Sequence, residues 1–188
     1  MSAGTVNKVL SELSEAALIE GGAITEKGYA ALEPYRVKRA IFIAAGFGSR
    51  MVPVTLNTPK PLIRVNGKRI IDTAIDAALA IGIEEIYIVR GHLAEQFDQL
   101  LYKYPMIKFL ENPIYNEANN ISSALLSRHL LQNAYVIEAD LILRNPGLIQ
   151  KYQYCSNYLG VPVTMTDDWC LEVKNNVIAN VQVGGKDC

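Results

Sequence analysis

RAIFIAAGFGSRM, residues 39–51, is the stretch of the sequence that decides the fold. Residues 40–45 are apolar or small, and such a run predicts a buried strand of a parallel sheet. Gly46 and Gly48 then end the strand, and glycine lets the backbone turn sharply and approach a ligand without a Cβ in the way. Successive backbone N–H groups in such a turn can bind an anion. The stretch therefore predicts a strand followed by a phosphate-binding turn.

Two cations follow this turn. Arg50 carries a planar guanidinium suited to bidentate phosphate binding, and Lys60 lies between two prolines in TPKPL, residues 58–62. The stretch does not fit a Walker A loop, and it lacks the third glycine of a dinucleotide fingerprint. A bare G-x-G turn is equally consistent with tight packing alone. The two cations, together with Asp140 after a later strand, favour a polyphosphate site over that alternative.

Strands and helices alternate through the middle of the chain. The apolar patterns predict further strands over residues 85–89, 107–110 and 134–138, and helices over residues 70–81, 93–104 and 119–131. This alternation predicts an α/β, Rossmann-like fold, with a mostly parallel sheet and helices on both faces. Ligands of such sheets bind beyond the carboxyl ends of the strands. Four of the predicted strands end there at Gly46, Gly91, Asn112 and Asp140.

The first 37 residues form a separate segment. Residues 5–19 have helical apolar spacing, and Thr25 can cap a second helix that ends near Leu32. The pattern resembles the end of a winged-helix module. A DNA-binding module needs an excess of positive charge, whereas residues 1–39 carry five basic and five acidic side chains. We therefore expect a winged-helix-like appendage over residues 1–37, a nucleotide-binding α/β domain over residues 38–188, and no nucleic-acid partner.

The composition argues against several classes of partner and against membrane insertion. The 188 residues are 50% hydrophobic and 20% charged with a net charge of −1, which gives no global field to attract nucleic acid or acidic membranes. No apolar run approaches the ~20 residues that span a bilayer. The three cysteines share no metal or redox spacing, and we expect a cytoplasmic protein without a membrane partner.

The C-terminal part of the sequence predicts a hairpin with strands over residues 169–173 and 176–183. No closing element follows this hairpin, so we expect the α/β domain to be incomplete at its C-terminus. An incomplete domain exposes apolar surface and an unpaired edge. We therefore expect that the chain could form a homodimer, or could belong with other modules of a longer polypeptide.

The glycine turn and the lysine segment together resemble a family signature. AAGFGSR, residues 44–50, with TPKPL is similar to the signature of the sugar-phosphate nucleotidyltransferase superfamily, which joins an NTP to a phosphorylated metabolite. Within it, YNEANNISS at residues 115–123, IEADL at residues 137–141 and DDW at residues 167–169 resemble the bacterial CTP:phosphocholine cytidylyltransferases. The resemblance covers about residues 39–188, and the family's domain is longer, with a second acidic metal ligand in the part that is absent here.

The resemblance implies roles for the matching residues on the nucleotide side. Gly48, Ser49 and Arg50 would wrap the β and γ phosphates of CTP. The other nucleotide-binding residues would lie against the base and ribose, and they are Ala44, Ala45, Gly46, Phe47, Asn112, Asn119, Asn120 and Ser122.

It also implies roles on the catalytic and acceptor sides. Arg50 and Lys60 would neutralise charge on the phosphates, and Asp140 would hold Mg²⁺, which prefers oxygen ligands. Glu138 would support the ion or the choline ammonium. Trp169 would contact the quaternary ammonium through its aromatic face, although a tryptophan on a strand is also an ordinary core residue.

The predicted function is transfer of CMP from CTP to phosphocholine, which gives CDP-choline and pyrophosphate. One alternative is nucleotidyl transfer to a sugar-1-phosphate or to phosphoethanolamine. A second alternative, from a different class, is a regulatory module that combines a nucleotide-sensing domain with a DNA-binding winged helix. The neutral charge of residues 1–39 argues against this second alternative.

Overall fold

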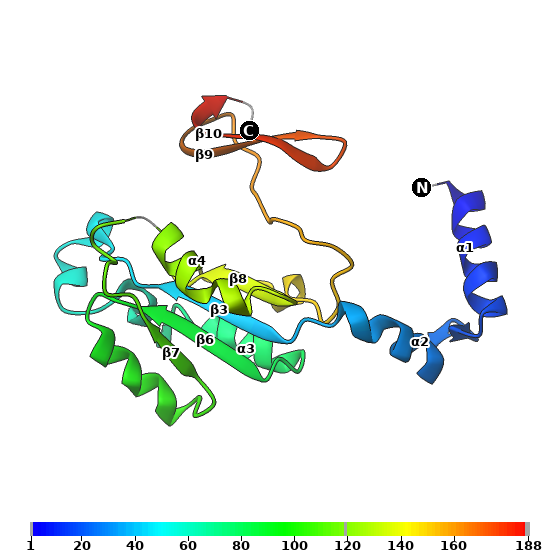
Figure 1. Ribbon diagram of the computed structural model, residues 1–188, viewed down its shortest axis with the longest axis horizontal. Helices are drawn as coiled ribbons and strands as arrows, with labels where there is room; N and C mark the ends of the chain where they lie inside the picture. The colour runs from blue at the N-terminus through cyan, green and yellow to red at the C-terminus, as the bar shows by residue number, and fades with distance from the viewer. Residues whose placement is uncertain (1, 119, 187–188) are drawn as a thin grey trace. The chain divides into compact units, whose positions relative to one another are not determined.

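The computed structural model describes residues 2–118 and 120–186. The chain separates into two compact units, Met1–Tyr154 and Cys155–Cys188 (Figure 1). The first unit holds a parallel sheet, and the second holds an antiparallel hairpin. The predicted division of the chain at residue 38 stays a prediction.

Four parallel strands form the sheet of the first unit, in the order β7-β6-β3-β8. The central strand β3 (Arg39–Ala44) pairs with β6 (Glu85–Arg90) on one side and with β8 (Ala134–Glu138) on the other, and β7 (Lys108–Glu111) pairs with β6. Every residue of β3 after Arg39 is buried, because helices cover both faces of the strand. All four predicted strands are confirmed, with ends that differ by at most one residue.

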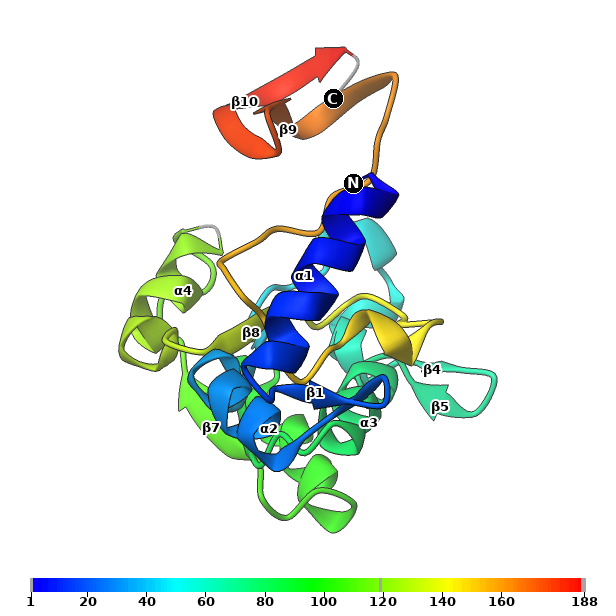
Figure 2. The same ribbon diagram turned by 90° about the vertical axis from the view of Figure 1, so that its right-hand side faces the viewer.

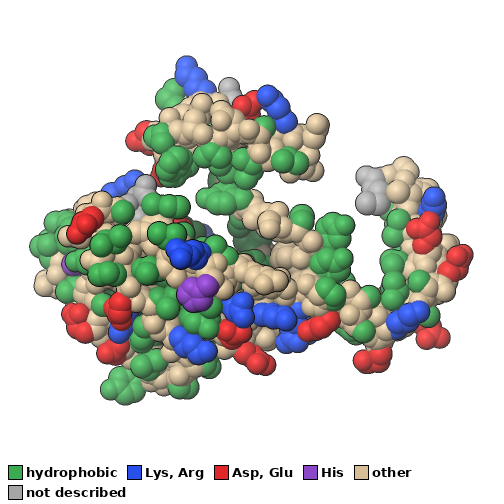
Figure 3. Space-filling view, in the orientation of Figure 1, with side chains coloured by type: hydrophobic (Ala, Val, Ile, Leu, Met, Phe, Trp, Pro, Cys, Tyr) green, Lys and Arg blue, Asp and Glu red, His purple; other side chains and the backbone are tan. Residues whose placement is uncertain are grey.

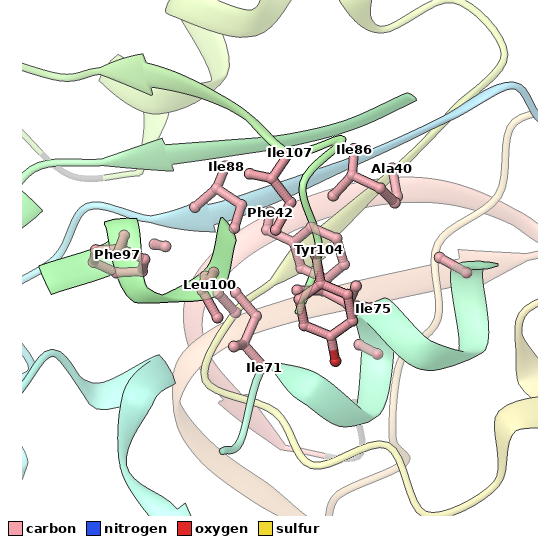
Figure 4. Packing of buried hydrophobic residues seen from close by; sticks show 14 of the residues in the cluster. Ala40, Phe42, Ile71, Ile75, Ile86, Ile88, Phe97, Leu100, Tyr104 and Ile107 are labelled. Atoms are coloured by element: carbon pink, nitrogen blue, oxygen red, sulfur yellow. The ribbon is translucent and has the colours of Figure 1, made fainter. Parts of the chain in front are cut away.

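Helical segments pack on both faces of this sheet. On one face α3 (Asp72–Ala80) and η5 (Ala94–Tyr102) enclose the larger core, in which Phe42, Ile75 and Tyr104 are fully or almost fully buried (Figure 4). On the other face Ile41 and Ile43 form a smaller core with Leu130 of η6 (Arg128–Leu130), and α4 (Ile121–Ser127) contacts β3. Alternate side chains along β3 thus belong to two separate cores, one on each face of the sheet. The predicted α/β fold is confirmed.

Two helices differ from their predicted form. The segment predicted as an α-helix over residues 93–104 is the 3₁₀-helix η5, which begins after Leu93 in the left-handed region at φ 49°. Its buried side chains Phe97 and Leu100 are three residues apart, and a 3₁₀-helix places such residues on one side. The helix predicted over residues 119–131 divides into α4 and η6.

A long connection joins β3 to α3. It contains three short 3₁₀-helices, η2 (Ser49–Met51), η3 (Val54–Leu56) and η4 (Lys60–Leu62), followed by the small hairpin of β4 (Arg64–Val65) and β5 (Lys68–Arg69) (Figure 2). The hairpin leads into α3 through a buried ion pair, in which Arg69 Nε lies 3.0 Å from an oxygen of Asp72. This connection carries most of the residues that the sequence assigns to phosphate binding.

The N-terminal segment contains two helices with a hairpin between them. α1 (Ala3–Glu15) is followed by β1 (Ile19–Glu20), β2 (Ala23–Ile24), α2 (Glu26–Leu32) and η1 (Glu33–Tyr35). Thr25 caps α2 as predicted, and its hydroxyl accepts from the N–H of Gly28 at 3.0 Å. None of the described residues of α1 is buried, and hydrophobic side chains gather along one side of it (Figure 3).

The chain returns to the start of the sheet after β8 and η7 (Pro146–Leu148). Val37 N–H donates to the carbonyl of Lys151 at 2.9 Å, and Gln153 N–H donates to the carbonyl of Tyr35 at 2.9 Å. These bonds tie residues 35–37, just before β3, to the last residues of the first unit.

The second unit is the hairpin of β9 (Met165–Lys174) and β10 (Val177–Lys186). The predicted hairpin is confirmed, and its strands are longer than expected. Asn175 and Asn176 form the turn with φ of 53° and 60°, in the left-handed region that asparagine tolerates. The described residues include no helix of the length and apolar character that crossing a membrane requires.

The cysteines give no support to the predicted location. Cys155 is exposed and free, and Cys170 is buried. The cytoplasmic location therefore stays a prediction.

Candidate functional site

The candidate site begins with residues 46–50, which we call the glycine loop. It follows directly on β3, where Ala44 and Ala45 are buried. Gly48 has φ +70°, and a Cβ added there would lie 3.0 Å from Thr55 Cγ2, so the fold itself requires this glycine. A Cβ added at Gly46 would meet no atom of the described residues within 4 Å. The first glycine therefore borders open space, where a ligand can approach the backbone.

Lys60 and Asp140 form an ion pair across the carboxyl edge of the sheet. Lys60 Nζ donates to Asp140 Oδ2 at 2.6 Å, and both side chains are partly exposed, at 28% and 40%. Asp140 follows β8, and the N–H of Ala139 donates to the carbonyl of Ile43 at 3.1 Å. This bond extends the pairing of β8 with β3 and brings Asp140 beside the start of the glycine loop. Two residues that the sequence predicted to act on one phosphate chain are thus in contact.

Glu138 lies two residues before Asp140, and it accepts a hydrogen bond from Asn120 Nδ2 at 3.1 Å. Burial and the negative charge of Asp140 raise the pKa of Glu138, and the hydrogen bond from Asn120 opposes that shift. Asn120 therefore uses its amide on Glu138 rather than as the cap of α4. The negative charge of Asp140 thus acts on the carboxyl group of Glu138 at one end of β8.

The carboxylates of Asp140 and Glu138 fit a magnesium ion. Mg²⁺ is usually bound through one or two carboxylates, with water and substrate phosphates supplying the remaining ligands. No cluster of three or more acidic, histidine or cysteine side chains suited to a metal occurs in residues 2–118 and 120–186. The donor set therefore suits an ion shared with bound phosphates rather than one held by the chain alone.

Asn112 and Ser122 are buried between β7 and α4. Asn112 Nδ2 donates to Ser122 Oγ at 2.9 Å and to Ser123 Oγ at 3.0 Å, and its Oδ1 accepts from the N–H of Ile114 at 3.2 Å. Both ends of the amide thus bind the chain itself and fix the first turn of α4 to the end of β7. Their predicted contact with the base stays a prediction, and the similar one of Asn119 lies outside the described residues.

Phe47, Ser49 and Arg50 are exposed around Gly48. Arg50 and Ser49 belong to η2. The N–H groups of Met51 and Val52, at the end of this helix, donate to the carbonyls of Gly48 and Ser49. Trp169 is 61% exposed on β9, where its N–H bonds to Asp168 at 2.8 Å. Trp169 belongs to the second unit, and its predicted contact with choline stays a prediction.

One residue at this edge carried no prediction from sequence. His92 follows β6, and its Nε2 lies 2.8 Å from the carbonyl oxygen of Thr55 in the long connection. Its ring also meets the ring of Phe47 edge-on, with 4.7 Å between the centroids. The only signal for it in the sequence is its place two residues after a strand, at the edge where ligands bind.

Comparisons with known proteins agree with this architecture. The model of the MobA-like NTP transferase domain matches residues 40–166. The chain is 40% identical over 152 residues to a 2-aminoethylphosphonate cytidylyltransferase of Lancefieldella rimae, which covers 79% of this chain and 62% of the relative. It is 44% identical over 102 residues to a choline-phosphate cytidylyltransferase of Streptococcus pneumoniae, which covers 54% of this chain and 44% of the relative.

A solved structure is similar over the same region. The CTP:phosphocholine cytidylyltransferase from Streptococcus pneumoniae matches with a TM-score of 0.73 and 37% identity, over 80% of this chain and 66% of that one. The α/β fold seen here is thus the nucleotidyltransferase fold of that structure. The chain spans less than two thirds of the length of the two curated relatives.

Proposed function

Because this chain belongs to the MobA-like NTP transferase domain family, we propose that it is a cytidylyltransferase that transfers CMP from CTP to phosphocholine. The observation that carries the proposal is the 2.6 Å contact between Lys60 and Asp140 beside the glycine loop. A cation and a carboxylate at that position supply what a magnesium-bound polyphosphate needs: one charge for the phosphate and one for the metal.

The reaction needs positioning and charge neutralisation rather than a protein base. A phosphate oxygen of the acceptor is already an anion; it forms a bond to the α-phosphorus of CTP, the bond from that phosphorus to the bridging oxygen breaks, and pyrophosphate leaves. Backbone N–H groups of the glycine loop and the Arg50 guanidinium bind the β and γ phosphates. Lys60 neutralises the phosphate under attack.

The ion pair explains how the site stays neutral before CTP arrives. Lys60 and Asp140 satisfy each other at 2.6 Å in the structure. A bound polyphosphate offers Lys60 a stronger anion, and Asp140 then becomes free for a cation. Mg²⁺ held by Asp140 and Glu138 would supply further neutralisation of the phosphate oxygens.

Trp169 and the choline-phosphate relatives favour phosphocholine as the acceptor. A quaternary ammonium has no N–H to donate, and it binds aromatic faces, with about 0.5–2 kcal/mol for each face. Trp169 exposes 61% of its surface, so its ring is free to take part in such a contact.

A second candidate acceptor is 2-aminoethylphosphonate. The 2-aminoethylphosphonate cytidylyltransferase of Lancefieldella rimae is 40% identical over 152 residues, a longer match than the 102 residues of the choline-phosphate relative. A primary ammonium can donate to carboxylates, and Glu138 is one at the candidate site. The two acceptors thus call on different side chains, Trp169 for one and Glu138 for the other.

A panel of acceptors measured by pyrophosphate release tests the proposal. CTP and Mg²⁺ are supplied with phosphocholine, phosphoethanolamine, 2-aminoethylphosphonate or a sugar-1-phosphate, and Asp140→Asn serves as the inactive control. We expect phosphocholine to have the highest kcat/KM, and Trp169→Ala to raise the KM for phosphocholine alone. Preference for 2-aminoethylphosphonate would favour the second candidate, and preference for a sugar phosphate would contradict both.

A further inference from the structure

His92 lies at the end of β6, beside the glycine loop, and the proposed reaction gives it no role. We infer that His92 is a positioning residue that holds the glycine loop and the following segment in the shape that binds a triphosphate. The nucleotide part of this inference rests on the proposed function, whereas the part on the loop itself does not.

The first contact of His92 joins it to the glycine loop through Thr55. His92 Nε2 lies 2.8 Å from the carbonyl oxygen of Thr55, and the hydroxyl of Thr55 donates to the carbonyl of Gly48 at 3.0 Å. Thr55 has no exposed surface. A chain of two hydrogen bonds therefore runs from the end of β6 to the glycine whose φ of +70° shapes the loop.

The second contact joins the imidazole ring to the loop directly. The rings of His92 and Phe47 are 4.7 Å apart and nearly perpendicular, at 75°, a geometry in which aromatic rings attract each other. The ring centroid of Tyr115 lies 6.3 Å from that of His92. The absence of a side chain at Gly91 leaves room for Tyr115, because a Cβ on Gly91 would lie 2.7 Å from it. The imidazole thus lies against Phe47 of the loop, with the ring of Tyr115, from the segment that follows β7, nearby.

The backbone of His92 fixes the base of this arrangement. Its N–H donates to the carbonyl of Ala45 at 3.0 Å, which lies immediately before the glycine loop. His92 therefore contacts the connection at three points: at Ala45 by its backbone, at Phe47 by its ring and at Thr55 by its Nε2. Because Phe47, Ser49 and Arg50 are exposed, contacts of this kind decide how well the loop is ordered.

The chemistry of the side chain allows the hydrogen bond to be tested apart from the ring. A carbonyl only accepts, so Nε2 must carry the proton in the contact with Thr55. Glutamine at position 92 keeps a donor nitrogen at a similar reach but has no ring, whereas phenylalanine keeps a ring without a donor. His129, an exposed histidine in η6, provides a matched control for the loss of an imidazole.

Hydrogen–deuterium exchange of the unliganded full chain tests the effect on the loop. In His92→Phe we expect exchange in residues 46–57 to accelerate by roughly two- to tenfold, the range that one lost hydrogen bond gives, with little change in β6. His92→Gln should restore most of the protection, and His129→Phe should match the wild type. A loop unchanged in His92→Phe, or equal loosening in the Phe and Gln variants, would overturn the inference.

Calorimetric titration with CTP and with CMP tests the link to the triphosphate. A loop that binds the β and γ phosphates should lose affinity for CTP by about two- to tenfold in His92→Phe, while the affinity for CMP changes less than about twofold. An equal loss for both nucleotides would show a general structural effect and would overturn the inference. Failure of the wild type to bind CTP would instead remove the proposed function, and the exchange measurement would still decide the role of His92.

Discussion

Lys60 and Asp140 are the residues on which the proposed chemistry depends most directly. Because their ion pair is partly exposed, it contributes at most about 1 kcal/mol to folding. We therefore expect Lys60→Met and Asp140→Asn each to lower kcat/KM by roughly 10²-fold or more, as loss of a preorganised charge does, with the fold intact. Steady-state pyrophosphate release and thermal denaturation measure the two effects.

The matched control for Lys60 is Lys103, which pairs with Asp76 at 2.9 Å on another part of the surface. Lys103→Met removes an equivalent exposed ion pair far from the glycine loop in the sequence. Its kcat/KM should stay within about twofold of the wild type, because surface pairs contribute little. Near-normal turnover in Lys60→Met or Asp140→Asn would contradict the roles given to those residues.

Glu138 makes stability depend on pH in a definite direction. Burial and the charge of Asp140 raise its pKa from the ordinary 4.5, so the unfolded chain releases this proton before the folded chain does. The folded state therefore loses stability as pH rises from about 4.5 through the raised pKa. Glu138→Gln keeps an acceptor for Asn120 but cannot ionise. Its stability relative to the wild type should rise between acidic and neutral pH, measured by urea denaturation, and a constant difference would contradict this account.

Charged residues and buried polar residues of the candidate site differ in what a sequence can say about their position. Lys60 and Asp140 were predicted to lie at the site because a cation between prolines and an acid after a strand have few purely structural uses, and the structure places the two in contact. The contact of Asn112 with a base stays a prediction, and in the structure its amide bonds to Ser122, Ser123 and Ile114. Which partner a neutral amide takes depends on the packing of α4 against β7, and a single sequence does not encode that distance. His92 was missed for the same reason.

At the scale of elements, the strands were the most predictable part of the fold. β3 is apolar without interruption because both of its faces are covered, and β8 is apolar but only partly buried at the edge of the sheet. Helix type was less predictable. Periodicity located η5 correctly, but the choice of a 3₁₀-helix follows from how Phe97 and Leu100 pack, which is a tertiary effect.

Substitutions of the two glycines of the loop should affect different quantities, stability at Gly48 and nucleotide binding at Gly46. Gly48→Ala places a Cβ 3.0 Å from Thr55 Cγ2 at a φ of +70°, and we expect a loss of roughly 1–2 kcal/mol in stability. Gly46→Ala adds a Cβ that meets no described atom within 4 Å, and its stability should change by less than about 0.5 kcal/mol.

Nucleotide binding, unlike stability, should be weakened by the substitution at Gly46. If Gly46 borders the nucleotide, the added methyl group of Gly46→Ala occupies space that the ligand needs, and affinity for CTP should fall by about tenfold or more. Urea denaturation and calorimetric titration of the same samples give both quantities. A Gly46→Ala variant that binds CTP as the wild type does would show that this open space is not the nucleotide site.

At the scale of the whole molecule, the N-terminal segment differs from the sheet in two ways: its charges balance, and its helices are mostly exposed. Its five basic and five acidic residues up to residue 39 cancel, and positive and negative side chains are interspersed on the face in Figure 3. The balance gives no electrostatic reason for DNA binding. Gly28 is the one described residue of α1 and α2 that is buried, so these helices add little to the core of the first unit.

Truncation tests where the stability of the first unit begins. Residues 35–37 bond to residues 151–153, and Val37 is 5% exposed within the main core, whereas the preceding helices are mostly exposed. A variant that lacks residues 1–32 should therefore keep its Tm within about 3 °C. A variant that lacks residues 1–37 should lose about 2–4 kcal/mol, because it removes a buried valine and the bonds that fasten the end of the unit. Circular dichroism on heating measures both, and CTP titration shows whether the site survives. Equal destabilisation by the two truncations would mean that α1 and α2 support the sheet after all.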